Sequence, residues 1–419
     1  MLRNYLLTAW KVFMRRKLFT AINLACIVLT LVVLMVITAL LEATFWPSGV
    51  EGRSDRFLQV YSMRSTSADS SMIRTSLLGY KTIDKYLKPM PGVERVSAFT
   101  TPSAVSIYQG ERVSELQMRR VDADYWRILD FTLLAGRLPN EDDEAAGRLV
   151  AVLNASSARL LFGGTPDAAV GKAFSAGGQP FQVIGVVEDV MHLNAFADLW
   201  APLSTFPSSD YRNQITGSFA AMLLAKSPAD LPRIQREVER IARNFVTEDP
   251  KNFAITTFWA DSKLDLVART LLASDINRGA GPDSGAAKLL AMIAGGMLVF
   301  MLLPALNLVN LNMGRILERS AEIGVRKAFG ATSMQLVGQL VIENIVLCLA
   351  GGLLGLAATQ GVLWWLESSQ LIPYLKVSMN LPVFGMGMLL AFVFGLLSGV
   401  IPAWKMSRLD PVHALKGAA

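Results

Sequence analysis

Residues 18–41, LFTAINLACIVLTLVVLMVITALL, form an apolar run without a charged side chain. At about 1.5 Å per residue, a helix of this length crosses a hydrocarbon core of roughly 30 Å. A cleaved signal peptide is the alternative, but its apolar region usually spans roughly 7–15 residues and ends at a small-residue cleavage site. The run here is longer, and no such site closes it. We therefore predict a spanning helix.

The chain as a whole is too apolar for an ordinary soluble enzyme, although it has 18% charged residues beside 52% hydrophobic ones. Its apolar residues must therefore be concentrated in segments. Three further candidates, 287–311, 335–366 and 381–403, follow a long interval in which no stretch qualifies as a span. The pattern predicts an α-helical membrane protein with four transmembrane helices and a large extracytoplasmic α+β domain, residues 42–286, inserted between helices 1 and 2.

The positions of Lys and Arg set the orientation of the spans, because these residues resist translocation. Basic side chains, with no acidic one among them, precede the first span (Arg3, Lys11, Arg15, Arg16 and Lys17), and others follow the last (Lys405, Arg408 and Lys416). The sequence therefore predicts cytoplasmic ends, 1–17 and 404–419, a cytoplasmic segment 312–334 between helices 2 and 3, and an outer loop 367–380.

Short β-rich runs and amphipathic helices alternate between the first two spans. Residues 56–63, RFLQVYSM, alternate like a half-buried strand, 79–100 predict a helix, a Pro/Gly turn and a strand, and 218–227 predict an apolar strand. Residues 229–245 predict a helix with one apolar face, formed by Leu231, Ile234, Val238, Ile241 and Phe245. These elements make up an α+β module.

A subdomain is predicted as an insertion over 116–205, with its start at 115 or 116, in which a helix leads to a β-hairpin-like stretch at 180–193. It carries an acidic patch, Glu141, Asp142, Asp143 and Glu144, which lacks the D-x-D-x-D-G spacing of a calcium loop, so we expect a solvated turn. The sequence GGTPDAAVGKA resembles a phosphate loop, but Pro166 and Ala173 stand where such a loop needs Gly and Ser or Thr.

The sequence contains no group of residues that indicates a catalytic site. His192 and His413 are the only histidines and fall on opposite sides of the predicted membrane, so we expect each to be a structural or surface residue. Cys26 and Cys348 both lie inside predicted spans, which leaves the outer domain without a disulfide. No basic stripe with interleaved aromatic residues indicates nucleic-acid binding. We predict no enzyme, no metal site and no cofactor in this chain.

A charged segment, ERSAEIGVRKAFGAT at 318–332, lies between the second and third predicted spans. Its charges mix with apolar residues, so a helix here would lie along the membrane surface rather than cross it. Glu322 and Arg326 are four residues apart and can pair, and Gly330 supplies a C-terminal stop. The alternative is a basic connector that merely enforces the topology.

Residues 319–355, RSAEIGVRKAFGATSMQLVGQLVIENIVLCLAGGLLG, resemble the signature of the MacB/FtsX-type ABC permease family, in which a Glu-containing helix and a Gly-rich turn follow the charged motif. The matching positions are Arg319, Glu322, Ile323, Gly324, Arg326, Lys327, Ala328, Gly330 and Ala331, then Glu343, Gly351, Gly352 and Gly355. The C-terminal GVIPAWKMSRLDPVHALKG is similar to the family's closing motif through Pro402, Ala403, Arg408, Asp410, Pro411 and Leu415. Residues 136–163 and 183–190 resemble its periplasmic core domain.

The resemblance implies a dimeric permease that couples cytoplasmic ATP hydrolysis to movements of its periplasmic domains, a mechanism called mechanotransmission. The segment 312–334 would then be the coupling helix that contacts the ATPase, with Arg315, Arg319, Glu322, Ile323, Gly324, Arg326, Lys327, Phe329 and Gly330 at the contact. Only seventeen residues precede the first span and no Walker motif occurs, so we expect two copies of a separate ATPase chain that binds ATP and Mg²⁺. The location implied is the bacterial inner membrane.

The cargo expected from the resemblance is a peptide, toxin, antibiotic or lipoprotein, with a periplasmic adaptor and an outer-membrane duct as further partners. Pro304 and Asn307 are the candidates for a kink in the second span, and we favour a packing role for them. Two alternatives stay open: an FtsX-like regulator of a cell-wall hydrolase that transports nothing, and a LolC/LolE-type lipoprotein-sorting permease. The second permease copy is identical or homologous.

Overall fold

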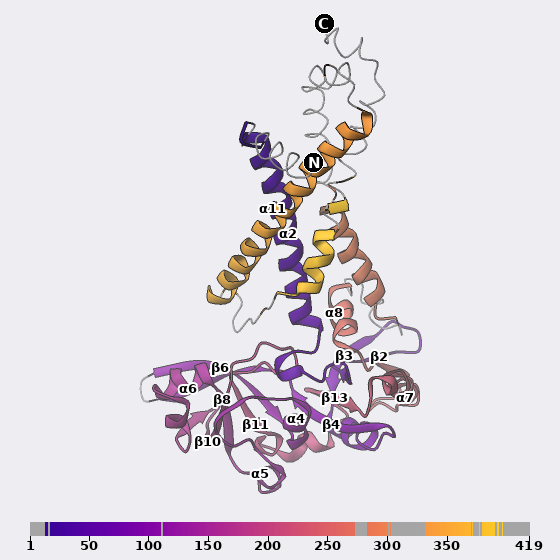
Figure 1. Cartoon of the computed structure of the whole chain (residues 1–419). Coiled ribbons are helices and arrows are strands. Elements are labelled where there is room, and N and C mark those ends of the chain that lie inside the picture. The colour runs from indigo at the N-terminus through magenta and orange to yellow at the C-terminus, as the bar shows by residue number, and fades with distance from the viewer. Residues whose placement is uncertain are drawn as a thin grey trace. The chain divides into compact units, whose positions relative to one another are not determined.

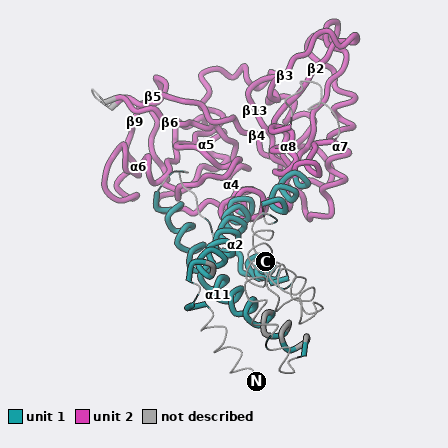
Figure 2. Tube along the Cα trace, turned by 90° about the horizontal axis from the view of Figure 1, so that it is seen from above, with its two compact units in different colours: residues 1–42, 290–419 teal, residues 43–289 magenta. Residues whose placement is uncertain are grey.

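The computed structural model describes residues 13–15, 17–109, 112–272, 283–300, 302, 325, 332–369, 371, 377, 379–389, 392–393 and 396. The chain forms two compact units, coloured differently in Figure 2: Met1–Glu42 together with Leu290–Ala419, and Ala43–Leu289. We call the first the membrane unit and the second the outer unit, and each is described by itself.

Two described helices of the membrane unit are long and apolar enough to cross a membrane (Figure 1). One is Thr20–Phe45 within α2 (Lys17–Phe45), and the other is Val341–Ser368 within α11 (Ser333–Ser368). They coincide with the predicted spans at 18–41 and 335–366. The other two predicted spans are described only in part, as the helix Ala286–Phe300 and helical residues 381–389, so the count of four stays a prediction.

The start of α11 is fixed by a capping box. The Thr332 hydroxyl accepts a hydrogen bond from the Gln335 backbone N–H at 3.3 Å, and the Gln335 side chain accepts one from the Thr332 N–H at 3.1 Å. The backbone of Thr332 is extended, so the chain changes direction there before it enters the helix.

The outer unit is built on one sheet of fourteen described strands in the order β11-β8-β10-β9-β5-β6-β4-β13-β3-β2-β14, with β1 paired to β13, β12 to β3 and β7 to β10. The strands are β1 Phe57–Val60, β2 Met63–Thr66, β3 Ile73–Leu78, β4 Val93–Thr100, β5 Ser103–Gln109, β6 Arg112–Val121, β7 Leu133–Gly136, β8 Val150–Asn154, β9 Ala173–Ala176, β10 Gln179–Val187, β11 Leu199–Pro202, β12 Thr216–Gly217, β13 Phe219–Ala225 and β14 Ile255–Phe258. The helices are η1 Gly49–Glu51, α3 Tyr80–Thr82, η2 Ile83–Leu87, α4 Ala123–Ile128, α5 Glu141–Ala145, α6 Ala155–Phe162, η3 Pro166–Ala169, η4 Leu203–Thr205, η5 Ser209–Asn213, η6 Pro228–Asp230, α7 Leu231–Arg243 and α8 Lys263–Leu272. This mixture confirms the α+β prediction.

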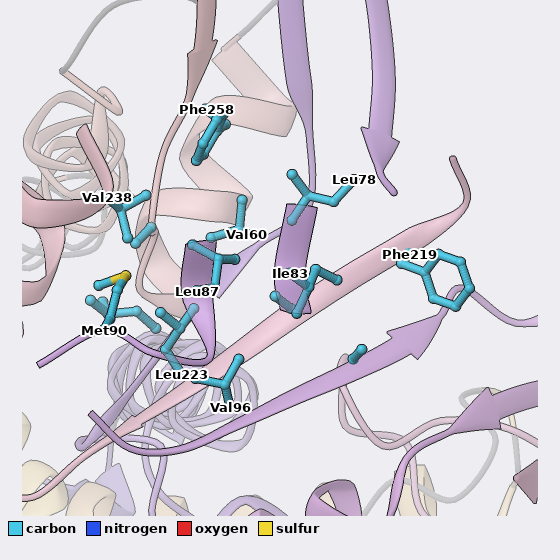
Figure 3. Close-up of a cluster of buried hydrophobic side chains, with 14 of the residues drawn as sticks. Val60, Leu78, Ile83, Leu87, Met90, Val96, Phe219, Leu223, Val238 and Phe258 are labelled. Carbon is cyan, nitrogen blue, oxygen red and sulfur yellow. The ribbon is translucent and has the colours of Figure 1, made fainter. Parts of the chain in front are cut away.

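Strand β13 is buried along its whole length because it has a hydrophobic cluster on each face. Its alternate residues Phe219 and Leu223 belong to one cluster, shown in Figure 3, and Met222 and Leu224 belong to a second. Successive side chains of a strand point to opposite faces, so a strand between two cores must be apolar throughout. The prediction of an apolar strand at 218–227 is confirmed.

Helix α7 covers the first of these clusters with the apolar face that the sequence predicts. Ile234 and Val238 are fully buried in the cluster, and Leu231, Ile241 and Phe245 pack around them. The prediction over 79–100 is also confirmed, since α3 and η2 lead through a turn into β4.

The half-buried strand predicted at 56–63 is wrong in one respect. Strand β1 is buried at every position, including Gln59. It pairs with β13, and Phe57 and Leu58 enter the two different clusters on the faces of that strand. The backbone of Gln59 exchanges two hydrogen bonds of 2.8 Å with Asp261, while its buried side-chain amide has no hydrogen-bond partner among the described residues.

A third hydrophobic cluster is made only of residues between Val105 and Ala201, and we call the part of the outer unit around it the lobe. Here α6 leads to an antiparallel β9–β10 hairpin, as predicted, but the hairpin turns at Gly177 and Gly178 and 188–193 form no strand. Because β5 adds Val105 and Ile107 to this core, the lobe reaches back before 116. The subdomain boundaries at 116–205 stay a prediction.

Candidate functional site

The predicted coupling segment, 312–334, lies outside the described residues except for Val325 and residues 332–334. This applies to all nine of its contact residues, Arg315, Arg319, Glu322, Ile323, Gly324, Arg326, Lys327, Phe329 and Gly330, and also to His413, Pro304, Asn307 and the closing motif at 399–417. Helix α11 begins where this segment ends, and α2 leads in sequence into the outer unit, so the described packing of these two helices is considered first.

Helices α2 and α11 pack closely through glycine. A Cβ atom added at Gly351 would lie 2.7 Å from Cγ2 of Ile27, and one at Gly355 would lie 3.1 Å from Cδ1 of Leu31. Both glycines are inside α11, so the Gly-rich turn expected from the family resemblance is wrong. Small residues on a membrane helix let two backbones approach. Because Ile27 meets Gly351 and, one turn on, Leu31 meets Gly355, the two helices run parallel.

The described part of the fourth predicted span packs on α2 in the opposite direction. A Cβ at Gly387 would lie 2.9 Å from Cδ2 of Leu34, while the Asn380 side-chain amide donates to both carboxylate oxygens of Glu42 at 2.9 and 3.0 Å. As residue numbers rise along α2, they fall along 380–387. The α2 helix is therefore antiparallel to this segment and fixed to it near its C-terminal end.

Large aromatic side chains are exposed toward the C-terminal ends of the two parallel helices. Trp364 and Trp365 of α11 are 66% and 54% exposed, and Trp46, directly after α2, is 62% exposed. Tryptophan is enriched where a membrane helix meets the water interface. These positions are therefore suited to a boundary between membrane and water.

A buried polar cluster lies in the outer unit where the chain arrives from α2. Glu51 of η1 is completely buried, and its Oε2 pairs with Nζ of Lys263, the first residue of α8, at 2.6 Å. Its Oε1 accepts hydrogen bonds from the backbone N–H and the side-chain amide of Asn194, both at 3.0 Å. We call these three residues, Glu51, Asn194 and Lys263, the root joint.

Asn194 is held in turn by Tyr61, which follows β1, by Arg119 of β6 and by Tyr125 of α4. Its side-chain oxygen accepts a hydrogen bond from the Tyr61 hydroxyl at 3.1 Å, and its carbonyl oxygen accepts bonds from the Tyr125 hydroxyl at 2.7 Å and from the Arg119 guanidinium. Arg119 is almost fully buried and lies over the Phe99 ring. Burial raises the pKa of both tyrosines well above the ordinary value, so they act as neutral donors.

The acidic patch at 141–144 is not a turn and is solvated only in part, because Glu141 and Asp142 are exposed whereas Asp143 is buried. It forms α5, which begins with a capping box between Asn140 and Asp143. The Asp143 carboxylate is fully buried and binds Arg137 at 2.5 and 2.9 Å and Arg148 at 2.9 Å. These hydrogen bonds hold its pKa well below the ordinary range. The patch therefore closes a structural ion-pair cluster within the lobe.

Two other aspartates have pKa values raised by burial. The pKa of Asp122, the N-cap of α4, rises to about 7, although Ser97 and the Ala98 backbone donate hydrogen bonds to it. The pKa of Asp261 rises to about 6, opposed by the nearby Arg269 guanidinium. Among the described residues, no group of three or more His, Cys, Asp or Glu side chains is placed to hold a metal ion.

The predicted structural role of His192 has a clear geometric basis. Its Nε2 lies 3.2 Å from the Ser48 hydroxyl, and its ring is next to Gly49, whose φ of +50° places it in the left-handed region. The histidine therefore packs against the chain just before η1.

Sequence reasoning missed the root joint. Its members are separated by 143 residues between Glu51 and Asn194 and by 69 between Asn194 and Lys263. None of them belongs to a periodic pattern or a motif. Only the position of Glu51, close behind the end of the first span, singles it out in the sequence.

Two family models match the chain: the MacB-like periplasmic core domain over residues 20–241 and the FtsX-like permease C-terminal region over 294–411. Together they cover most of both units. The first of these matches alone extends over more than half of the chain.

Among similar proteins, the uncharacterized ABC transporter permease YknZ of Bacillus subtilis is 26% identical over 340 residues, which are 79% of this chain and 77% of that one. The macrolide export ATP-binding/permease protein MacB of Chromobacterium violaceum is 27% identical over 297 residues, 70% of this chain and 42% of that one. The matched region thus spans less than half of the length of this MacB relative.

Solved structures with a similar chain include the extracellular domain of YknZ, with a TM-score of 0.38, 18% identity, and coverage of 48% of this chain and 98% of that one. The periplasmic region of MacB from Actinobacillus actinomycetemcomitans has a TM-score of 0.36 at 18% identity, and the match covers 54% of this chain and 98% of that one.

Proposed function

The chain belongs to the MacB/FtsX-type ABC transporter permeases, and on this premise we propose that it couples ATP hydrolysis by a separate ATPase chain to movements of its outer unit. The ATPase would bind the segment 312–334 on the cytoplasmic side of the bacterial inner membrane. The outer unit would lie in the periplasm, and both chain ends would be cytoplasmic. The chain itself would bind no cofactor, because ATP and Mg²⁺ belong to the partner.

The single observation that carries this proposal is the packing of α2. It is one unbroken helix, Lys17–Phe45, that packs in parallel with α11 through Gly351 and Gly355 and in antiparallel fashion with 380–387. Spans 1 and 3 of a four-span permease must run in one direction and span 4 in the other, so these directions support the predicted topology. A helix packed tightly along its length moves as a rigid rod, which suits the transmission of a displacement across the membrane.

The coupling segment would suit docking because a helix of this sequence would combine an apolar patch with a polar rim. Ile316 and Ile323 would enter a groove of the ATPase, and Glu322 and Arg326 would set its orientation. Charges at the rim of an interface contribute specificity more than raw affinity. ATP-driven closure of two ATPase subunits would bring two such segments, from two identical or homologous permeases, together.

The cargo we propose is a peptide, toxin, antibiotic or lipoprotein that is handled on the outer side and passed to a periplasmic adaptor and an outer-membrane duct. The MacB relatives are macrolide exporters by name, and an antibiotic cargo for this chain is a proposal from that similarity. The match to the MacB-like periplasmic core domain favours export over regulation of a cell-wall hydrolase.

The test is ATP hydrolysis by the ATPase subunit co-purified with this chain in nanodiscs. We expect Glu322→Arg and Arg326→Glu each to abolish association or permease-dependent hydrolysis, because each puts a like charge at the docking rim. Arg236→Glu, a reversal on the exposed face of α7, is the matched control and should behave like wild type.

The double reversal Glu322→Arg with Arg326→Glu separates docking from helix stability. It restores the pairing within the helix but not the charge pattern that faces the ATPase, so it should remain uncoupled. If the single reversals bind and stimulate the ATPase as wild type does, the segment is only a topological connector and the docking site lies elsewhere.

A further inference from the structure

We infer that the root joint is the element that makes the two membrane-linked ends of the outer unit and the lobe move as one piece. The inference rests on the proposed function, because it names the residues that would receive the displacement carried by α2. Glu51, Asn194 and Lys263 are thus positioning residues, and they bind neither cargo nor nucleotide.

Two members of the joint lie in elements that are linked to the two ends of the outer unit. Glu51 follows the last residue of α2, Phe45, by only six positions, and Lys263 begins α8. Helix α8 is also bonded to the segment that leaves the outer unit. Ser284 lies two residues before the helix Ala286–Phe300, and its hydroxyl donates a hydrogen bond to Asp265 of α8. The Glu51–Lys263 pair therefore joins the entering segment to α8, and α8 is bonded in turn to the leaving segment through Ser284.

The third member carries the connection into the lobe. Asn194 belongs to the segment between β10 and β11, and Leu199, five positions later, begins β11. Strand β11 pairs with both β6 and β8, and Leu199 and Ala201 are part of the lobe core. A displacement of Glu51 thus reaches the lobe through two hydrogen bonds to Asn194 and the short segment that follows it.

The cost of burial indicates that the joint has a geometric role. The Glu51 side chain has no exposed area and that of Lys263 has 6%, and neither Glu51 Oε2 nor Lys263 Nζ has a further hydrogen-bond partner among the described residues. A buried ion pair contributes little net stability, because desolvation offsets its attraction, yet removal of one partner is strongly destabilising. The free-energy cost of separating the two charges is therefore larger than the net contribution of the intact pair to the stability of the fold.

A second contact keeps α8 from turning about the joint. Arg269, nearly two turns along α8, binds Asp261 at 2.8 and 3.0 Å, and the backbone of Asp261 pairs with Gln59 of β1. With Lys263 held at one end and Arg269 farther along, α8 is fixed at two points. Movement of the entering segment is then passed to the lobe instead of being absorbed by rotation of α8.

The experiment is hydrogen exchange of the full chain in nanodiscs with its ATPase subunit, compared without nucleotide and with ATP plus vanadate. The variant is the double substitution Glu51→Gln with Lys263→Met. It removes both charges together, so that no unpaired charge stays buried, and it keeps an oxygen acceptor for Asn194. The control is Arg53→Gln, two residues away, which breaks the half-exposed pair with Asp130 outside the joint.

In wild type and the control, we expect nucleotide to change exchange at 49–51, at 193–195 and at 261–263 together. In the double variant, ATPase association and the response at 49–51 should persist, and the response at 193–195 should be lost. A double variant whose 193–195 response equals that of wild type overturns the inference.

Wild type alone provides a second criterion that needs no variant to fold. If 49–51 and 193–195 respond with different dependence on nucleotide concentration, the segments do not move as one piece and the joint has no transmitting role. If wild type neither retains the ATPase nor responds to nucleotide at 49–51, the proposed function itself fails, whatever the joint does.

Discussion

A methyl group at Gly351 tests whether α2 and α11 are locked together. The added Cβ would lie 2.7 Å from Cγ2 and 3.0 Å from Cβ of Ile27. Carbon atoms in contact prefer a separation of about 3.5–4.0 Å, so the helices must part by roughly 0.5–1 Å, a gap that forfeits about a quarter to a half of each affected contact. Because Ile27 Cβ is fixed to its backbone, no rotamer change relieves the overlap.

Gly361 is the matched control in the same helix, since a Cβ there would meet no atom within 4 Å. Gly→Ala in a helix interior gains about 1 kcal/mol from helix propensity at either site, and overpacking at Gly351 costs about 1–3 kcal/mol. The propensity gain cancels between the two variants. We therefore expect Gly351→Ala to be less stable than Gly361→Ala by about 1–3 kcal/mol.

The assay is unfolding of the full chain in mixed micelles by titration with sodium dodecyl sulfate, followed by far-ultraviolet circular dichroism. A double-mutant cycle with Ile27→Ala adds a second comparison. That change removes Cγ2 and leaves Cβ at 3.0 Å, so Gly351→Ala should cost less in the Ile27→Ala background than in wild type. The reasoning is refuted if Gly351→Ala is at least as stable as Gly361→Ala, or if Ile27→Ala leaves its cost unchanged.

Two predictions concern titrating groups of the outer unit, and both are measured as thermal unfolding of the full chain against pH. Asp143→Asn should lower stability by about 1–3 kcal/mol at neutral pH, because it breaks the capping box and the bonds to Arg137 and Arg148. Since the pKa of Asp143 is depressed in the fold, its contribution is present above the ordinary aspartate pKa and the difference from wild type should shrink as the pH falls below about 4; a difference that does not change with pH would contradict the assignment. For Asp122 the change of stability with pH has the opposite sign. Burial raises its pKa to about 7, so between about pH 4 and pH 7 the native state holds a proton that the unfolded chain has released. Wild type should therefore lose more stability than Asp122→Asn as the pH rises from about 4 to about 7, and parallel curves for the two proteins would show that Asp122 is ionised throughout.

Several elements could be predicted because their patterns depend on local periodicity. The apolar face of α7 follows from residues spaced three and four apart, and the stretch Phe219–Ala225 has no polar residue that could face water. Such patterns survive into the structure because burial of that face is the main contribution to the element's stability.

Other features were mistaken because the deciding partner is distant in the sequence. Glycines at 351–355 read as a turn when taken alone, whereas in the structure they are the positions at which Ile27 and Leu31 of another helix approach. The acidic run at 141–144 reads as solvated, yet Asp143 is buried because Arg137 and Arg148 converge on it. A glycine can occur in a turn or at a close helix contact, and an aspartate can be solvated or buried in an ion pair. In both cases a contact with residues elsewhere in the chain determines which environment occurs.

The sequence by itself determined the membrane character of this chain, the sequence order of its units and its family, because charge-free runs and contiguous motifs are local properties. The tertiary structure alone decided the directions in which α2, α11 and 380–387 pack and brought Glu51, Asn194 and Lys263 together. The physical reason is that each of these contacts joins residues far apart in the chain, whose meeting depends on the complete sheet and on helix packing rather than on the preference of any one segment.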